Sequence, residues 1–354
     1  MKKVAIVGFG FMGKTHYGAW KKCRGAKVVA VCDNNLAQLT AKVVGNIKGA
    51  ADNSSLPKSV RVWADFGEML AAGGIDIVDI TLPTPLHPRM TVAALEAGCN
   101  VLCEKPMALT LKDCDAMLAA ERKSGRKLLV AQCCRFDPAY AYVRRLVKDR
   151  TYGKTIAAEF TRFMAAPKWS PKGGSWLLDE TKSGGLYVDA HVHDADLVRF
   201  IFGEPKRAVS RGHRSAHGYT DHTVTRYEYA DGKLVTAASS FAAASSLVFD
   251  AAARFFFEGA TVYLGGAYRS PLTVYPDGGK AFQPKLPKLS GYEAEVRYFL
   301  DLVEGRVRPK DAVLTAGDAR ASIALVLNER AQARGSRSIP ATSISRTAAR
   351  TFWT

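Results

Sequence analysis

The chain contains no apolar run long enough to cross a membrane. The apolar residues 4–7 near the N-terminus are followed by three glycines and Lys14, and no small-residue cleavage site comes after them. This pattern favours a buried first strand over a signal peptide. We therefore expect a cytoplasmic protein without a membrane partner.

The sequence also lacks a cysteine pair at the CxxC spacing of a zinc site. Its seven cysteines are odd in number, and all of them precede residue 135. Several stand inside apolar, strand-like runs, as in Val31-Cys32. We interpret them as reduced, buried thiols that pack as small hydrophobic side chains, which argues against a disulfide framework.

No long basic run, internal repeat or low-complexity segment is present, although the formal net charge is +17. Scattered lysines and arginines are typical of a solvated basic surface, so we expect no nucleic-acid partner, while an anionic substrate stays compatible with the charge. The 354 residues, of which 47% are hydrophobic, suffice for two domains with a sizeable core.

Strand and helix patterns alternate in the first third of the chain. Apolar runs of strand length occur at residues 4–7, 28–32, 75–80, 101–103 and 128–131. Helical patterns cover 91–97 and 109–123, and Thr110 with Asp113 gives the second one a capping-box start. The alternation predicts an α/β domain of Rossmann type, with a parallel sheet covered on both faces, over residues 1–125.

After residue 125 the pattern changes. The expected elements are a strand at 155–164, a helix at 189–200, several strands with turns within 206–275, and helices at 292–303 and 315–333. They predict an α+β domain over residues 126–354, in which helices flank a mostly antiparallel open sheet. Such a sheet needs a cover on its second face, which favours a homodimer or homotetramer formed through it.

A glycine-rich loop carries the first chemical signal. It follows the first predicted strand, precedes a helical stretch and reads Gly8-Phe9-Gly10-Phe11-Met12-Gly13. In dinucleotide-binding folds the first glycine makes a tight turn, the second lets the backbone approach the pyrophosphate, and the third permits close helix–strand packing. The loop predicts a bound nicotinamide dinucleotide.

Asp33 indicates which dinucleotide this is. It stands 20 residues after Gly13, at the end of the second predicted strand, where an acid can bond the ribose hydroxyls of adenosine. An acid there repels a 2′-phosphate, and Asn34 and Asn35 offer no cation for one. We therefore expect NAD, with NADP as the alternative.

Two further segments hold candidate catalytic groups. Glu104-Lys105-Pro106 follows a predicted strand at its carboxyl end, where open α/β sheets bind ligands and a lysine can reach a substrate oxygen. Asp189 and His193 are four residues apart, so a helix would place them on one face. A carboxylate that orients an imidazole and favours its protonated form makes a workable general base.

These signals, in this order, resemble the Gfo/Idh/MocA family (glucose–fructose oxidoreductase, inositol dehydrogenase and rhizopine catabolism) over residues 2–335. The supporting stretches are 78–87, 104–109, 135–138 and 184–196. The resemblance implies an NAD(P)-dependent oxidoreductase that transfers a hydride between nicotinamide and a secondary hydroxyl or ketone of a sugar, cyclitol or glycoside. It also implies that Lys105 polarises the substrate oxygen and that Asp189 and His193 form the acid/base pair.

The resemblance extends to the residues that line the ligands. Along the cofactor it implies, besides the glycine loop, Asp33 and Asn34, the residues Thr81, Leu82, Pro83, Thr84, His87, Glu104, Lys105 and Cys133. The substrate set comprises Lys105, Arg135, Trp169, Trp176, Asp189, His191 and His193. The two tryptophans belong to it because aromatic faces pack on sugar rings, although both can equally serve to anchor their loop.

His191 departs from the family pattern, in which a small residue, commonly glycine, stands two positions before the catalytic histidine. An imidazole at this position can touch substrate or Asp189. With His193 it also allows a metal-dependent enzyme, although residues 189, 191 and 193 cannot share one face of a helix. Two further alternatives are a glycoside-cleaving enzyme that retains and internally recycles NAD, and a nucleotide-binding module without catalysis, although the presence of Lys105, Asp189 and His193 argues against the second.

Overall fold

The computed structural model describes residues 1–43, 45, 50–167, 176–247, 249–265 and 270–335. The chain forms two compact units, Met1–Asp137 with Leu289–Arg320, and Pro138–Lys288 with Ala321–Thr354. The first unit thus extends past residue 125, the boundary expected from the sequence, because a sixth strand and a late helix belong to it. Among the described residues no helix is both long and apolar enough to span a membrane.

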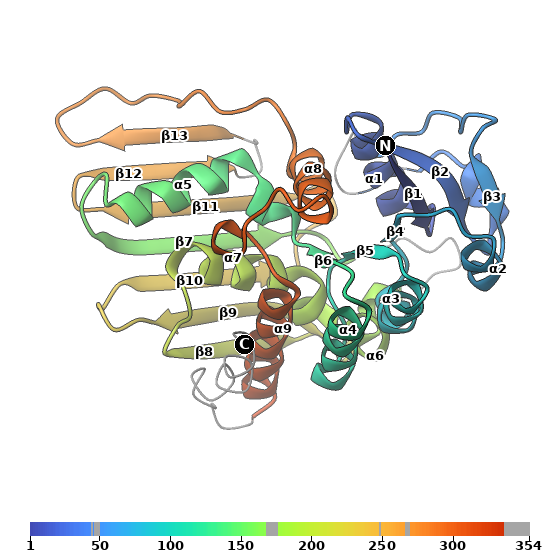
Figure 1. Cartoon of the computed structure of the whole chain (residues 1–354). Helices are drawn as coiled ribbons and strands as arrows, with labels where there is room; N and C mark the ends of the chain where they lie inside the picture. The colour runs from blue at the N-terminus through green and yellow to red at the C-terminus, as the bar shows by residue number, and fades with distance from the viewer. Residues whose placement is uncertain (44, 46–49, 168–175, 248, 266–269, 336–354) are drawn as a thin grey trace. The chain divides into compact units, whose positions relative to one another are not determined.

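The first unit is built on a six-stranded parallel sheet (Figure 1). Its strands are β1 (Lys2–Val7), β2 (Ala26–Cys32), β3 (Arg61–Trp63), β4 (Ile77–Ile80), β5 (Asn100–Glu104) and β6 (Leu128–Ala131). Their order, β3-β2-β1-β4-β5-β6, is that of a dinucleotide-binding fold. Every residue of β4, β5 and β6 is buried, as continuous apolar strands predicted. The predicted Rossmann fold is confirmed, and only the short edge strand β3 was not expected.

Helices cover this sheet. They are α1 (Phe11–Lys21), α2 (Phe66–Ala71), α3 (His87–Glu96), α4 (Leu111–Ser124) and, from much later in the chain, α8 (Gly291–Val303), with short 3-10 turns at Leu36–Leu39, Thr84–Leu86, Cys133–Phe136 and Pro309–Asp311. The predicted cap of α4 is present, because the Thr110 hydroxyl oxygen accepts the Asp113 N–H at 3.1 Å. Phe299 and Leu300 of α8 share one hydrophobic core with Trp20 of α1.

The second unit is built on a seven-stranded sheet. Its strands are β7 (Thr155–Phe163), β8 (Arg207–Arg214), β9 (Thr220–Glu228), β10 (Leu234–Ser240), β11 (Asp250–Phe257), β12 (Ala260–Gly265) and β13 (Ser270–Pro276). The order is β13-β12-β11-β7-β10-β9-β8, and every neighbouring pair is antiparallel except β7 with β10. The expected mostly antiparallel sheet is therefore confirmed.

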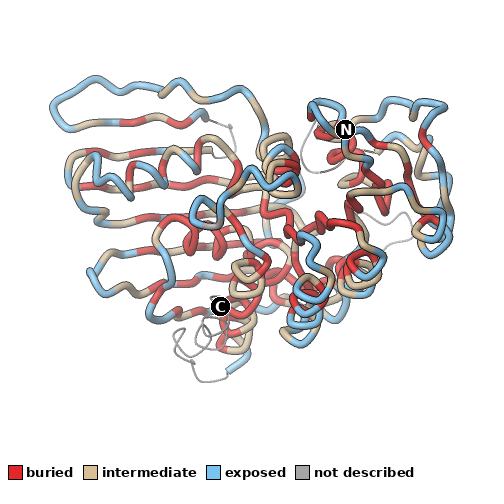
Figure 2. The backbone as a smooth tube through the Cα atoms, in the orientation of Figure 1, coloured by how far each residue is buried: buried red, intermediate tan, exposed pale blue. Residues whose placement is uncertain are grey.

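Helices lie against one face of the second sheet (Figure 1). They are α5 (Pro138–Asp149), α6 (Glu180–Ser183), α7 (Val192–Phe202) and α9 (Ala316–Ala333), with a 3-10 turn at Trp176–Leu178 and a π turn at Tyr187–His191. Burial alternates along the strands, as Figure 2 shows, because successive side chains point to opposite faces. In β9, for example, Thr225 and Tyr227 are buried, whereas Val224 and Arg226 are exposed.

A buried ion pair joins the sheet to α7. The Arg162 guanidinium on β7 donates Nε to one oxygen of Asp194 and Nη2 to the other, both at 2.9 Å. The two side chains are 6% and 1% exposed. Since α7 follows directly on the π turn that contains Asp189, this pair anchors the segment that carries the candidate acid/base residues.

We expect Arg162→Leu to lower the free energy of unfolding by about 3–5 kcal/mol, because it leaves a carboxylate buried without its cation. Urea denaturation measures the change. Arg226→Leu, which removes an exposed partner of Glu228, is the control and should cost at most about 0.5 kcal/mol. Equal effects of the two substitutions would show that the buried pair contributes nothing special.

Candidate functional site

The glycine loop joins β1 to α1, and each of its glycines is required for a different reason. Gly8 has a φ of +90°, which a side chain disfavours. A Cβ placed on Gly13 would lie 2.1 Å from the carbonyl oxygen of Gly8, so α1 packs on the strand more closely than any side chain allows. Among the described residues, no atom lies within 4 Å of a Cβ placed on Gly10. The loop is thus open only where a pyrophosphate has to approach.

Neighbouring strand ends hold this loop in shape. Asp33, at the end of β2, accepts the Phe9 N–H at 2.7 Å on one oxygen and the Asn35 N–H at 2.8 Å on the other. The Thr81 hydroxyl, just after β4, donates to the Gly8 carbonyl at 2.6 Å. Each Asp33 oxygen keeps a second lone pair that can accept a ribose hydroxyl. The residues present therefore fit a dinucleotide.

The two phenylalanines of the loop contact other parts of the first unit. The Phe9 ring is fully buried and meets Tyr17 edge to face, with 5.7 Å between ring centroids. The Phe11 ring lies against Gly45, because a Cβ placed on that glycine would be 2.4 Å from it. Phe9 therefore has only backbone groups to offer a cofactor.

We expect Gly10→Ala to weaken NADH binding and Gly13→Ala to lower the stability of the protein. Gly10→Ala should leave the free energy of unfolding within about 0.5 kcal/mol of the wild type, because its methyl group meets no protein atom. The same methyl group occupies the approach to the pyrophosphate. The Kd for NADH should therefore rise about tenfold or more, which corresponds to the loss of one close contact.

Gly13→Ala, by contrast, should destabilise the protein by about 1–3 kcal/mol, since the backbone has to move away from the new methyl group. Urea denaturation and quenching of protein fluorescence by NADH measure the two quantities. Unchanged NADH binding by Gly10→Ala would contradict the assignment of this loop.

Lys105 directly follows β5, at the same edge of the sheet as the glycine loop. Its backbone N–H donates to Glu104 Oε2 at 2.8 Å, and its peptide bond to Pro106 is cis. His87 lies beneath, with Nδ1 2.8 Å from the Pro106 carbonyl oxygen and Nε2 2.8 Å from that of Leu82. Burial lowers the pKa of His87. Because both ring nitrogens of His87 face carbonyl groups, we interpret it as a support for two loops, and the cofactor contact expected from the sequence stays a prediction.

A buried cluster beneath Lys105 was missed in the sequence. His16 of α1 lies between carboxylates, with Nδ1 3.0 Å from both oxygens of Asp79 and Nε2 3.0 Å from Glu104 Oε1. Glu295 of α8 is the third carboxyl group, 3.9 Å from Nε2. Trp20 donates its indole N–H to Asp79 at 2.7 Å. One signal was available, an aspartate inside the apolar run 75–80, but nothing local connects it to Glu295.

The protonation of this cluster follows from its contacts. Burial by itself lowers the pKa of His16, but the charges of Asp79 and Glu104 and their hydrogen bonds outweigh it and raise this pKa well above its usual value. Burial also raises the pKa of Glu295 well above the ordinary range. These shifts favour the protonated forms of both His16 and Glu295.

Two residues after β6 have different environments. Arg135 is buried and donates Nη1 to the Val313 carbonyl at 3.1 Å. This contact ties the turn to the segment before α9, and the substrate contact expected for Arg135 stays a prediction. Cys133 is partly exposed, and a hydrogen bond with Cys134 together with burial raises the pKa of its thiol, which keeps the thiol protonated.

Asp189 and His193 lie on the second unit. Asp189 belongs to the π turn Tyr187–His191, and His193 is the second residue of α7. Both are partly exposed, whereas the three residues between them are buried. This alternation agrees with the predicted placement of the two residues on one face, although a π turn takes the place of the regular helix.

His191 lies in the interior of the second unit and is 0% exposed. Its Nδ1 is 2.8 Å from the Ser239 hydroxyl oxygen, and its Nε2 is 3.1 Å from a carboxylate oxygen of Glu329, which is also fully buried. The hydroxyl oxygens of Thr225 and Tyr227 lie 3.3 and 3.4 Å from Nε2. Its ring thus packs between the sheet and α9, and the substrate contact expected for His191 stays a prediction.

The metal-dependent alternative loses its basis for the same reason. Both ring nitrogens of His191 already have protein partners. Within the part of the chain that the structure describes, no group of three or more His, Cys, Asp or Glu side chains could hold a metal ion.

Of the two tryptophans expected to contact the substrate, Trp169 lies outside the described residues, and Trp176 begins a 3-10 turn.

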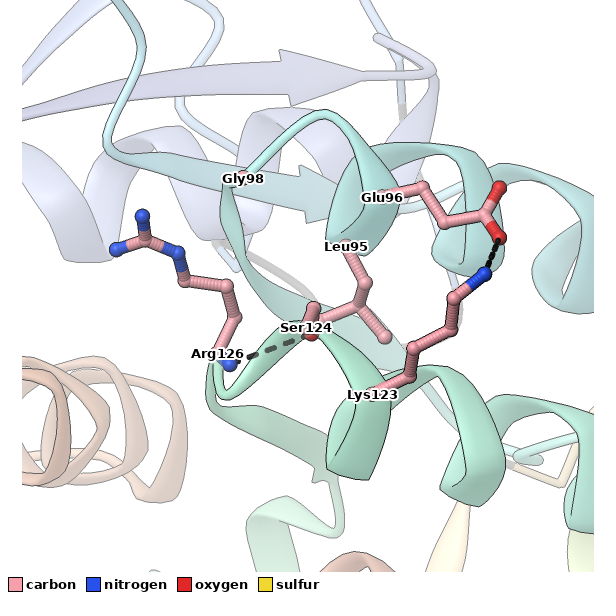
Figure 3. A pocket seen from close by; sticks show the side chains of 6 residues that line it. All are labelled: Leu95, Glu96, Gly98, Lys123, Ser124 and Arg126. Carbon is pink, nitrogen blue, oxygen red and sulfur yellow. Dashed lines mark hydrogen bonds and ion pairs between the residues drawn. The ribbon is translucent and has the colours of Figure 1, made fainter.

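The first unit also has a surface hollow, which Figure 3 shows. It is lined by Leu95, Glu96, Gly98, Lys123, Ser124 and Arg126. These residues precede β5 and β6, so the hollow lies at the amino ends of the strands. Open α/β sheets bind ligands at the carboxyl ends, where the glycine loop, Asp33 and Lys105 are found. We therefore do not assign the cofactor to the hollow.

Comparison with known proteins identifies the family. Residues 2–132 match the oxidoreductase family with an NAD-binding Rossmann fold, and residues 140–262 match the Gfo/Idh/MocA C-terminal domain. The chain belongs to the Gfo/Idh/MocA family. Its first unit is accordingly an NAD-binding Rossmann domain, as the glycine loop had indicated.

Curated relatives within this family act on sugars and cyclitols according to their names. The chain is 32% identical to a D-apiose dehydrogenase of Paraburkholderia graminis, over 59% of this chain and 52% of that protein. It is 30% identical to an NAD-dependent scyllo-inositol 2-dehydrogenase of Bacillus subtilis, over 65% of this chain and 64% of that protein. The matches thus span between half and two-thirds of these relatives.

Solved structures of the Gfo/Idh/MocA type share the whole fold. An oxidoreductase from Agrobacterium radiobacter, crystallised with NAD+, L-tartaric acid and magnesium, is 20% identical with a TM-score of 0.79, over 97% of this chain and 99% of that one. An aldose–aldose oxidoreductase from Caulobacter crescentus has a TM-score of 0.80 at 20% identity, over 96% and 99% of the two chains. At this identity the likeness concerns the fold alone.

Proposed function

We propose that the protein is an NAD-dependent dehydrogenase that oxidises a secondary hydroxyl of a sugar, cyclitol or glycoside, or reduces the corresponding ketone. The observation that carries the proposal is the carboxyl edge of the first sheet. There the glycine loop, Asp33 and Lys105 follow β1, β2 and β5, so that a dinucleotide site and a cationic side chain share one edge. The names of the curated relatives support the substrate class.

In the proposed reaction each protein group has one task. His193 takes the proton of the substrate hydroxyl, and Asp189 orients the imidazole and stabilises its protonated form. Lys105 donates a hydrogen bond to the same oxygen and stabilises the negative charge that develops on it. Bound NAD supplies the hydride-accepting chemistry. In the reducing direction the proton returns from His193 to the oxygen.

Asp33 supports NAD in preference to NADP. Its carboxylate is held by two backbone N–H groups, so it cannot turn aside to admit a 2′-phosphate without losing both bonds. A phosphate placed beside this fixed negative charge would be repelled. Thr81 supports the cofactor site by its hydrogen bond to the Gly8 carbonyl. Glu104 supports it by accepting the backbone N–H of Lys105.

A spectrophotometric screen at 340 nm tests the proposal. Inositols, D-apiose, other sugars and D-glucosides are each offered with NAD and with NADP, and we expect NADH formation with at least one compound and a clear preference for NAD. Release of free sugar from a glycoside without NADH accumulation would instead support the glycoside-cleaving enzyme. No turnover with any compound, combined with tight NADH binding, would favour a binding module without catalysis.

The catalytic roles are tested with the most active compound. We expect His193→Ala and Lys105→Ala each to lower kcat by about 10²–10⁴-fold, the usual contribution of a general base or of an oxyanion donor. The Kd for NADH of His193→Ala should change little. Wild-type turnover by either variant would remove that residue from the mechanism.

We also propose that the open face of the second sheet forms a homo-oligomer. The helices of this unit cover the other face, and the partly exposed face carries small side chains at its centre, among them Thr161 of β7 opposite Ala238 of β10. Flat surfaces of small side chains allow two sheets to approach closely. A second copy of the same face is self-complementary under two-fold symmetry.

Ala238→Arg should convert the oligomer to monomers, because it places a charge at the centre of this face. Light scattering coupled to gel filtration measures the mass. Ala71→Arg, an exposed position in α2 of the first unit, is the matched control and should leave the mass unchanged. A monomeric wild type, or an oligomer that survives Ala238→Arg, would contradict this interface.

A further inference from the structure

His16 is held by a carboxylate on each side of its ring. Nδ1 is equidistant from the two oxygens of Asp79, at 3.0 Å, and Nε2 lies 3.0 Å from Glu104 Oε1. The side chain is fully buried, and its carboxylate partners come from β4 and β5, two neighbouring strands. An imidazole with a carboxylate at each nitrogen donates from both, so its ring orientation is determined by two bonds.

Glu104 transmits this orientation to Lys105. One of its oxygens accepts from His16, and the other accepts the Lys105 backbone N–H at 2.8 Å. Its side chain is 6% exposed. The carboxylate thus bridges a helix that starts at the glycine loop and the residue that follows β5.

We propose that His16 is a positioning residue for Lys105: it fixes the Glu104 carboxylate, which in turn holds the Lys105 backbone at the carboxyl end of β5. The effect of His16 on catalysis rests on the role given to Lys105 under the proposed function. The hydrogen bonds that link His16, Glu104 and Lys105 do not depend on that role, because they lie within the first unit. His16 therefore couples the helix that faces the cofactor phosphates to the lysine that faces the substrate.

The other groups around His16 do not replace it. Asp79 also accepts from Trp20, so it keeps one partner when the imidazole is removed. Glu295 and Tyr292 approach from α8, the first as a third carboxyl group at 3.9 Å and the second with its ring centroid 6.1 Å from that of the imidazole. Neither brings a positive charge. Without His16, Glu104 therefore faces Asp79 and Glu295 with no cation between them, and its carboxylate has a reason to move.

Amide hydrogen exchange tests the link without any substrate. In His16→Gln we expect the Lys105 amide to exchange at least tenfold faster than in the wild type, because its acceptor is no longer held. The amides of Val101 and Leu102 in the same strand should keep their rates, since their bonds are made within the sheet. Residue-resolved exchange by NMR, or by mass spectrometry with electron-transfer fragmentation, measures all three.

Glu295→Gln is the matched control. The Glu295 carboxyl is buried in the same cluster, and this burial raises its pKa and so favours its neutral form. An amide of the same shape should therefore leave Lys105 exchange within about twofold of the wild type. Unchanged exchange at Lys105 in His16→Gln overturns the proposal. Equal acceleration at Val101, Leu102 and Lys105 also overturns it, because that result means a general loosening of the sheet.

Glu104→Leu keeps the test decisive if His16→Gln does not fold. Glu104 accepts from His16 on one oxygen and from the Lys105 N–H on the other, whereas leucine can accept from neither. The Lys105 N–H then loses its acceptor, and Lys105 exchange should again accelerate. A Lys105 amide as protected as in the wild type overturns the link.

A double-mutant cycle measures the functional consequence. With the most active compound of the panel, His16→Gln should lower kcat about tenfold in the wild type but less than twofold in Lys105→Ala, because the effect passes through the missing side chain. Losses that multiply overturn the positioning role while leaving the proposed function intact. Full activity of Lys105→Ala alone refutes the role of Lys105 in the proposed function, and the exchange result then stands by itself.

Discussion

The first unit depends on how closely helix α1 approaches strand β1. At Gly13 the helix backbone comes so near the Gly8 carbonyl that no side chain fits between them. This approach aims the N-terminus of α1, with its N–H groups, at the place where a pyrophosphate binds. One turn further along, it also brings His16 over the carboxyl ends of the central strands, within 3.0 Å of Asp79 and Glu104.

The titratable side chains buried around His16 are arranged as partners of one another. His16 lies between Asp79 and Glu104, so each of these two carboxyl groups has the imidazole as a partner. Truncating one member of such a group is costly, since the others remain buried. The same principle operates in the second unit, where His191 lies against Glu329 and Arg162 binds Asp194. These contacts hold the turn that carries Asp189 and the helix that carries His193.

Local patterns predicted most of the architecture. The five apolar runs became β1, β2, β4, β5 and β6, because a strand buried on both faces is apolar at most of its positions. Turn residues and alternation predicted an antiparallel second sheet for a similar reason. The edge strand β3 was missed because its three residues, Arg61–Trp63, are too few to form an apolar run of strand length.

The candidate site was predictable where a motif lies within one loop. Gly8 makes a turn with positive φ and Gly13 permits close packing, as expected, since both purposes concern the backbone of neighbouring residues. Side chains that meet across the fold were not predictable. The sequence indicated ligand contacts for His191, His87 and Arg135, but not the protein groups against which each of them is buried.

The sequence alone was therefore sufficient to predict the Rossmann fold and the dinucleotide loop, and Asp33 indicated a preference for NAD. Each of these predictions depends on a local pattern in the chain, such as an apolar run or a loop motif. Tertiary structure alone decided which titratable side chains are buried and with whom. Glu295 reaches His16 across 279 positions of the chain, and Glu329 reaches His191 across 138. Such pairs are set by the packing of helices on sheets, and no spacing in the sequence records it.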